Sequence, residues 1–135
     1  MKIDKGKFSI SPSDLNNFVA CKFSIKYAIK YHNKEISKIA DRVNDKLWKE
    51  MGIEHEKKHL KLLKNKYKKS IAIKSDLDEK NRFNETIRAM EKGYELIYHA
   101  YLVDGDLRGE ADFLIKCDTP SKLGDYSYEV YDTKI

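Results

Sequence analysis

The chain has 135 residues, of which 36% are charged and 41% hydrophobic, and its formal net charge is +5. That length suits one small domain, and no apolar stretch approaches the roughly 20 residues of a membrane span. Two distant cysteines, Cys21 and Cys117, make no disulfide framework, and no signal peptide opens the chain. We therefore expect a soluble, cytoplasmic protein without a membrane partner, whose basic excess suits an anionic partner such as nucleic acid.

The first half of the chain predicts helices. Residues 10–32 read as a helix, with Ser11 as a plausible N-cap. A second helix is expected from about Asp45 to Tyr67, with apolar residues on one side and lysines on the other. The apolar members are Trp48, Met51, Ile53, Leu60, Leu62, Leu63 and Tyr67, and the lysines are Lys57, Lys58, Lys61, Lys64 and Lys68. His55 and His59 fall within the apolar arc and are expected to face the body of the protein.

The second helix contains a His-Glu-x-x-His string, formed by His55, Glu56 and His59. This string is typical of zinc metallopeptidases, in which the two histidines share a helical face and a third ligand completes the site. The two middle residues of such a helix are usually uncharged, whereas here they are Lys57 and Lys58. A zinc peptidase and a pair of packing histidines therefore remain alternatives to a function that uses only one of these residues.

The second half of the chain predicts a small sheet. Residues 70–75 are a short strand candidate, and a helix capped by Asn81 or Asn84 should end near Gly93. Strands are expected after Gly93, after a turn at Asp104-Gly105, and over the last eight residues. The fold class is therefore α/β, with N-terminal helices packed on a three-stranded mixed sheet.

Acidic residues stand out on two of the expected strands. Asp112 lies in an apolar run, where a carboxylate is costly to bury without a partner. Asp132 and Lys134 are two residues apart, so they project to the same side of the last strand; Glu110 shares the face of Asp112. Two carboxylates bind hard cations through oxygen, and a lysine can offset charge that develops on a phosphate. This combination favours metal-assisted phosphodiester hydrolysis.

Three segments in this order resemble the motifs of a known enzyme group. "GIEH" (52–55) matches a Gly-x-x-His helix motif, and "GEADFLI" (109–115) followed by "YEVYDTKI" (128–135) matches two strand motifs. The set is similar to the RecB-like branch of the PD-(D/E)xK nuclease superfamily, and the similarity covers most of the chain. It implies a restriction-endonuclease-like core, incomplete at its C-terminal side.

The resemblance also implies a role for each site residue. Lys134 would be the catalytic lysine, acting with the two aspartates, and Glu110 and Glu56 would be auxiliary residues. The ligands implied for Mg²⁺ or Mn²⁺ are His55, Asp112, Asp132 and the backbone carbonyl oxygen of Thr133. An iron–sulfur cluster is not supported, because only Cys21 occupies a candidate position.

Members of this branch continue beyond the Asp-x-Lys motif into a helix with Gln and Tyr and a further strand, whereas this sequence ends one residue after Lys134. We therefore expect residues 1–135 to be a single domain, the N-terminal part of a longer nuclease domain and inactive alone. Tyr128, either Val130 or Tyr131, and Ile135 should then be unusually exposed.

The resemblance implies a metal-dependent deoxyribonuclease, exonuclease-like, that acts in DNA repair, replication or defence. Its partners would be DNA and further domains of the same polypeptide, such as a helicase. RNA as the substrate and the polarity of cleavage stay open. An inactive nucleic-acid-binding module is the alternative, and the zinc metallopeptidase that uses His55, Glu56 and His59 is a third.

Overall fold

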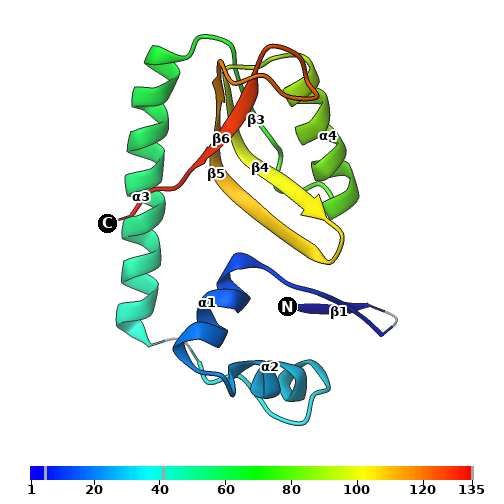
Figure 1. The fold of residues 1–135 in the computed structure, drawn as a ribbon. Helices are drawn as coiled ribbons and strands as arrows, with labels where there is room; N and C mark the ends of the chain where they lie inside the picture. The colour runs from blue at the N-terminus through cyan, green and yellow to red at the C-terminus, as the bar shows by residue number, and fades with distance from the viewer. Residues whose placement is uncertain (5, 41, 135) are drawn as a thin grey trace. The chain divides into compact units, whose positions relative to one another are not determined.

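The computed structural model describes residues 1–4, 6–40 and 42–134, and it divides into two compact units. One unit comprises Met1–Arg42 and Val103–Gly109, and the other comprises Val43–Leu102 and Glu110–Ile135. Figure 1 shows the helices and strands that make up each unit. No helix in the described ranges is long and apolar enough to cross a membrane.

The first unit begins with a hairpin that the sequence did not predict. Strands β1 (Lys2–Asp4) and β2 (Lys7–Ser9) pair antiparallel, and α1 (Pro12–Ala20) and α2 (Ser24–His32) follow. The expected helix over residues 10–32 is thus two helices, because the backbone at Cys21 is extended (φ −152°). The predicted N-cap is confirmed: the Ser11 hydroxyl accepts a hydrogen bond from the Asp14 N–H in a capping box.

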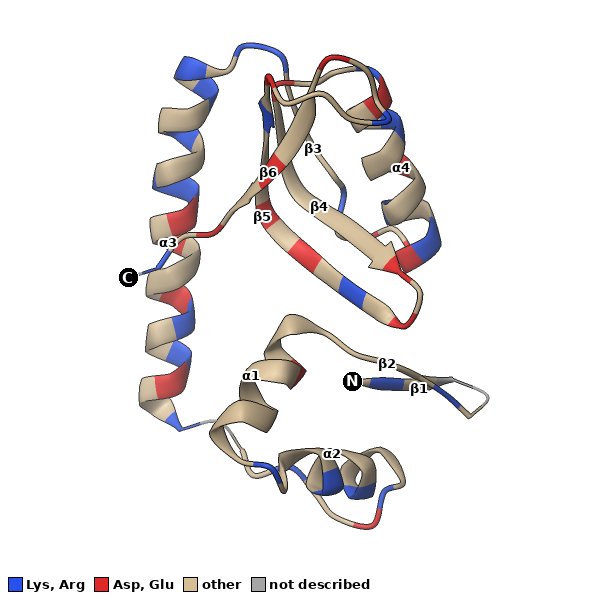
Figure 2. Ribbon diagram, viewed as in Figure 1, with Lys and Arg blue, Asp and Glu red and all other residues tan. Residues whose placement is uncertain are grey.

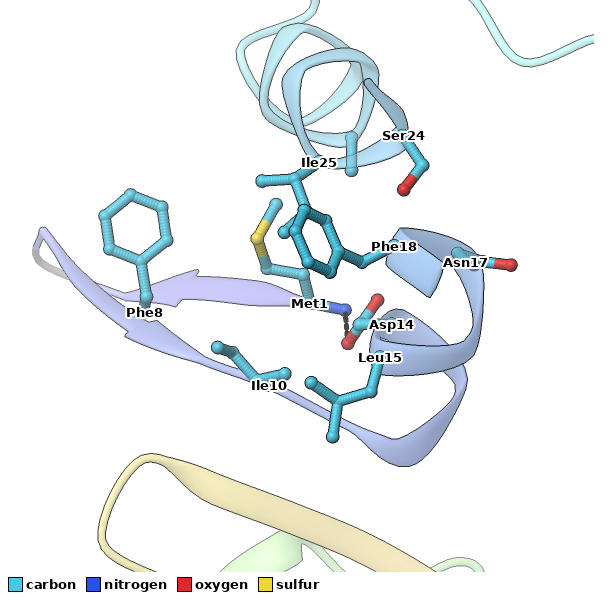
Figure 3. Close-up of a pocket in the computed structure, with 10 residues that line it drawn as sticks. Met1, Phe8, Ile10, Asp14, Leu15, Asn17, Phe18, Ser24 and Ile25 are labelled. Carbon is cyan, nitrogen blue, oxygen red and sulfur yellow. Dashed lines mark ion pairs between the residues drawn. The ribbon is translucent and has the colours of Figure 1, made fainter. Parts of the chain in front are cut away.

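A cavity of about 300 Å³ lies inside this unit. Figure 3 shows its lining, which is mainly apolar and comes from the hairpin and both helices. At its edge the amino group of Met1 forms an ion pair with Asp14 at 2.5 Å. Burial alone would raise the pKa of Asp14, but hydrogen bonds from this amino group and from Ser11 outweigh it and lower the pKa to about 2.

The second unit is built on a four-stranded mixed sheet in the order β3-β4-β5-β6. Its strands are β3 (Ser70–Ala72), β4 (Leu96–Asp104), β5 (Leu107–Cys117) and β6 (Ser127–Tyr131). β3 pairs parallel with β4, and β5 pairs antiparallel with β6. The α/β class is confirmed, but the sheet has four strands where three were expected. The fourth is β3, which lies in the strand candidate at residues 70–75 and pairs parallel with β4.

Helices α3 (Val43–Lys66) and α4 (Glu79–Glu91) cover opposite faces of this sheet (Figure 1). On the α4 side, Ala89 packs with Ile97 and Leu114, and on the α3 side Leu60 and Leu63 pack against a second buried cluster. That second cluster consists of Leu96, Phe113 and Ile115. The acidic strand residues thus lie on a sheet that has a hydrophobic core on each face.

The predicted apolar side of α3 is only partly buried. Leu60, Leu63 and Tyr67 pack on the sheet as expected, because the last turns of the helix lie over β4 and β5. The prediction is wrong for the others, since Trp48, Met51, Ile53 and Leu62 are exposed. Figure 2 shows lysines along the whole helix.

The cap of α4 also differs from the prediction. The helix begins after Asp78, whose carboxylate accepts from the Asn81 N–H at 3.2 Å, so neither Asn81 nor Asn84 is the cap. Asp78 can act as the cap because its backbone is extended (ψ 161°), which leaves the side chain free to turn back to the first N–H groups of the helix.

The predicted exposure of the last strand is confirmed for Val130 and Tyr131, whose exposed fractions are 61% and 46%. It is wrong for Tyr128, which packs against the core on the α4 side and donates its hydroxyl proton to the Tyr94 carbonyl at 2.6 Å. Ile135 lies outside the described residues.

Thr86 links α4 to β4 and gives a test of the core. Its side chain is fully buried, and its hydroxyl donates to the Arg82 carbonyl at 2.9 Å and accepts from the Tyr101 N–H at 3.0 Å. Thr86→Val removes both hydrogen bonds of this buried hydroxyl and should lower the free energy of unfolding by about 1–3 kcal/mol in urea titrations. Thr86→Ser keeps both bonds and is the control; a valine variant as stable as the serine variant would contradict this role.

Candidate functional site

Asp112 and Asp132 meet where β5 and β6 end their pairing. The register of the two strands, with Phe113 opposite Tyr131, places Asp112 opposite Asp132, the first residue beyond β6. The two carboxyl groups lie close enough for each to shift the pKa of the other, and the Thr133 N–H donates to Asp112 Oδ2 at 3.2 Å. The structure therefore brings the two predicted carboxylates together.

The environment of this acid pair favours one shared proton. Burial raises the pKa of Asp112 to about 6, and the hydrogen bond with Asp132 and the charges of Asp132 and Glu56 act in the same direction. The hydrogen bonds from Asp112 and Lys134 lower the pKa of Asp132. Near neutral pH the two carboxyl groups thus repel each other unless a proton or another cation lies between them.

Lys134 attaches directly to this pair. Its ammonium group forms an ion pair with Asp132 Oδ2, and that bond raises the pKa of Lys134. The two residues lie on the same side, as alternation predicted, although they follow β6 instead of belonging to it. The side chain of Lys134 is 82% exposed, so a substrate in solution can reach its ammonium group.

Glu56 is the α3 residue that acts on the acid pair, since its charge contributes to the raised pKa of Asp112. Its Oε1 accepts a hydrogen bond from the Tyr98 hydroxyl at 2.5 Å and lies 2.7 Å from His99 Nε2. The other auxiliary residue, Glu110, forms an ion pair with Arg82 and lies 3.7 Å from His99 Nδ1. Both auxiliary carboxylates therefore contact the same imidazole.

The two histidines of the His-Glu-x-x-His string lie in different surroundings. His59 is half-buried, with its ring 5.6 Å from that of Phe113 in an edge-on contact. His55 is exposed, contrary to the expectation that it faces the body of the protein. Within the described ranges, no three His, Cys, Asp or Glu side chains are grouped closely enough to hold a metal ion. The structure thus joins Asp112, Asp132 and Lys134 without adding His55 to them.

Tyr98, His99 and Arg82 were missed by the sequence analysis. The available signal was two adjacent polar aromatic residues within an otherwise apolar strand, "LIYHAYL", but their joint contact with α3 depends on backbone geometry at His99. Thr133 contributes its N–H to Asp112, whereas the predicted contribution is its carbonyl oxygen.

The two carboxyl groups of the acid pair could hold a hard divalent cation. Two carboxyl groups that meet directly, one of them with a raised pKa, are a donor set in which a cation can replace the shared proton. The exposed lysine beside them suits an anionic substrate. Comparisons of this chain with protein families, with curated proteins and with solved structures found no match to any of them.

Proposed function

We propose that this protein is a metal-dependent nuclease that hydrolyses phosphodiester bonds of DNA. The observation that supports the proposal is the Asp112–Asp132 pair with Lys134 bound to one of its carboxylates. Asp112, Asp132 and the Thr133 carbonyl oxygen would hold Mg²⁺ or Mn²⁺. When bound, the ion supplies Lewis-acid polarisation of the phosphate and a lowered pKa of water.

The residues of the chain supply the remaining chemistry. The Lys134 ammonium group reaches solvent while Asp132 holds it, so it can meet a phosphate oxygen as negative charge develops there. Lysines occur along α3 among a smaller number of acidic residues (Figure 2), and this basic excess suits a nucleic-acid backbone. The role of His55 as a further ligand rests on the resemblance and stays a prediction.

The wider biological assignment rests on the resemblance alone. It comprises exonuclease-like cleavage, a place in repair, replication or defence, and further domains such as a helicase, whereas the cytoplasmic location rests on the cysteine content and the N-terminal sequence. An inactive nucleic-acid-binding module and a zinc peptidase would each use parts of the same surface. A cleavage assay with three substrates separates these possibilities.

The full-length product of the gene, of which residues 1–135 are expected to be the N-terminal part, should cleave end-labelled DNA with Mn²⁺ or Mg²⁺ and show no cleavage in EDTA, because the acid pair needs a cation to approach a phosphate. RNA of the same sequence and casein with Zn²⁺ serve as parallel substrates. DNA binding without cleavage under any metal would favour the binding module, and cleavage of casein that depends on zinc would favour the peptidase. Either result would overturn the nuclease proposal.

A further inference from the structure

We propose that the cavity of the first unit is a binding site for a small, neutral and largely apolar molecule that carries one hydrogen-bonding oxygen, such as an alcohol. The lining comes from the hairpin of β1 and β2 and from helices α1 and α2 (Figure 3). This site goes beyond the nuclease proposal, because its lining belongs to the unit that contains Met1–Arg42, whereas the acid pair belongs to the other unit.

The cavity has the size and the lining of a small-molecule site. Its volume of about 300 Å³ is at the lower end of the range of ligand pockets. Most of the lining residues are apolar, namely Met1, Phe8, Ile10, Leu15, Phe18, Ile25 and Ala28. Phe8, Leu15 and Phe18 keep 45%, 49% and 40% of their surface exposed, so a molecule in solution can reach the lining. Covering these side chains with an apolar ligand removes them from water, which favours binding.

Ser24 gives the wall of the cavity a free hydrogen-bonding group. Its Oγ is buried and has no hydrogen-bond partner among the residues that the structure describes. A buried hydroxyl without a partner is unfavourable, and such groups in native proteins usually meet a water molecule or a ligand. Figure 3 shows this hydroxyl on the side of α2 that faces Phe18. The Ser24 hydroxyl is therefore the group that would bind the oxygen of the ligand.

The other polar groups of the lining favour a neutral ligand. The Met1 amino group and the Asp14 carboxylate neutralise each other in their ion pair. Asp14 Oδ2 also accepts hydrogen bonds from the Ser11 N–H at 2.8 Å and from the Ser11 hydroxyl at 2.6 Å. Asn17 is exposed and turns its side chain away from the cavity (Figure 3). Across the described lining there is no further ionisable side chain, so a charged ligand would lose its hydration without gaining an opposite charge.

Isothermal titration of the full-length gene product with benzyl alcohol, toluene and benzoate tests the inference, because these probes share one ring and differ at a single substituent. Benzyl alcohol should bind about 3- to 10-fold more tightly than toluene, as one net hydrogen bond allows. Benzoate should bind less tightly than benzyl alcohol. Ser24→Ala should remove the advantage of benzyl alcohol and leave the dissociation constant of toluene within about 2-fold of wild type.

Ala28→Leu shows whether the probes bind in this cavity. Ala28 lines the cavity, so a larger side chain occupies part of its volume and should weaken the binding of toluene and of benzyl alcohol at least about 10-fold. Ala20→Leu is the matched control, because Ala20 is exposed at the end of α1 and is not part of the lining. This control should bind both probes as the wild type does. Thermal unfolding establishes that each variant is folded.

Three results would overturn the inference. Equal affinity of the wild type for benzyl alcohol and toluene, or tighter binding of benzoate, would contradict a neutral ligand held through its oxygen. A preference for benzyl alcohol that persists in Ser24→Ala would remove Ser24 from the site. No binding of either probe, or wild-type binding by folded Ala28→Leu, would remove the cavity itself. Each of these results leaves the nuclease proposal intact, because the acid pair lies in the other unit.

Discussion

Lys134→Ala should lower the rate of DNA cleavage by at least about 100-fold, whereas the affinity for DNA should change by less than about 3-fold. The reason is that an ammonium group that meets charge developing in the transition state contributes little to binding of the substrate in its ground state. The structure supports a large effect on the cleavage rate and a small effect on the affinity for DNA. The ammonium group is held beside the acid pair by Asp132 and is otherwise open to solvent. Single-turnover cleavage and fluorescence anisotropy with labelled DNA in Ca²⁺ measure the two quantities separately.

Lys122→Ala is the matched control for Lys134→Ala. Lys122 is an exposed lysine in the turn between Ser121 and Gly124, so its loss changes the net charge equally without touching the acid pair. The control should retain wild-type cleavage. Equal cleavage by Lys134→Ala and Lys122→Ala would remove Lys134 from the mechanism, and a parallel loss of DNA affinity and cleavage would make it a binding residue only.

Asp112→Asn should abolish metal-dependent cleavage and yet make the protein more stable at pH 7. Asparagine keeps the shape and can still donate to Asp132, but it removes the repulsion between two carboxylates. A pKa near 6 instead of 3.8 corresponds to about 3 kcal/mol, which solvent screening at this half-buried position reduces to about 1 kcal/mol. The unfolding midpoint in EDTA should therefore rise by about 3 °C.

The stability gain of Asp112→Asn should depend on pH. The folded-state pKa of Asp112 is raised to about 6, above the value of 3.8 for a free aspartate, so the native state binds the proton more tightly than the unfolded state. The destabilisation is therefore complete above pH 6 and disappears as the pH falls from about 6 to about 4. The stability gain of Asp112→Asn should shrink over the same window, whereas a constant gain would contradict the assigned cause.

Asp118→Asn provides the control for stability, because Asp118 is exposed in the loop after β5. It should change the midpoint by less than about 1 °C at either pH, as surface substitutions usually do. Mn²⁺ should raise the midpoint of wild type and of Asp118→Asn, but not that of Asp112→Asn, since only a protein that binds the ion in its native state is stabilised by it.

The acid pair could be predicted from sequence because its determinants are local. Asp112 stands within an apolar strand, and Asp132 and Lys134 are spaced for one side of an extended chain. A short connection between neighbouring strands then makes their pairing the simplest arrangement. The register that places Asp112 opposite Asp132 follows from the same alternation that buries Phe113 and Leu114 on opposite faces of the sheet.

The contacts of Glu56 could not be predicted because they depend on one backbone angle. A period-two reading of β4 puts Tyr98 and His99 on opposite faces, and only the left-handed φ of His99 brings both to α3. The extent to which α3 is buried also could not be predicted from the sequence. Helical periodicity identified an apolar arc that includes His55, but tertiary contacts bury only the last turns of that arc.

The anomalous difference map of a crystal grown with Mn²⁺ tests the central claim most directly, because it locates the ion without reference to activity. The account predicts a peak between Asp112 and Asp132, at about 2.0–2.3 Å from an oxygen of each carboxylate. A manganese peak held by His55 and His59 instead, or an acid pair that keeps its shared hydrogen bond with no peak beside it in saturating Mn²⁺, would contradict the account.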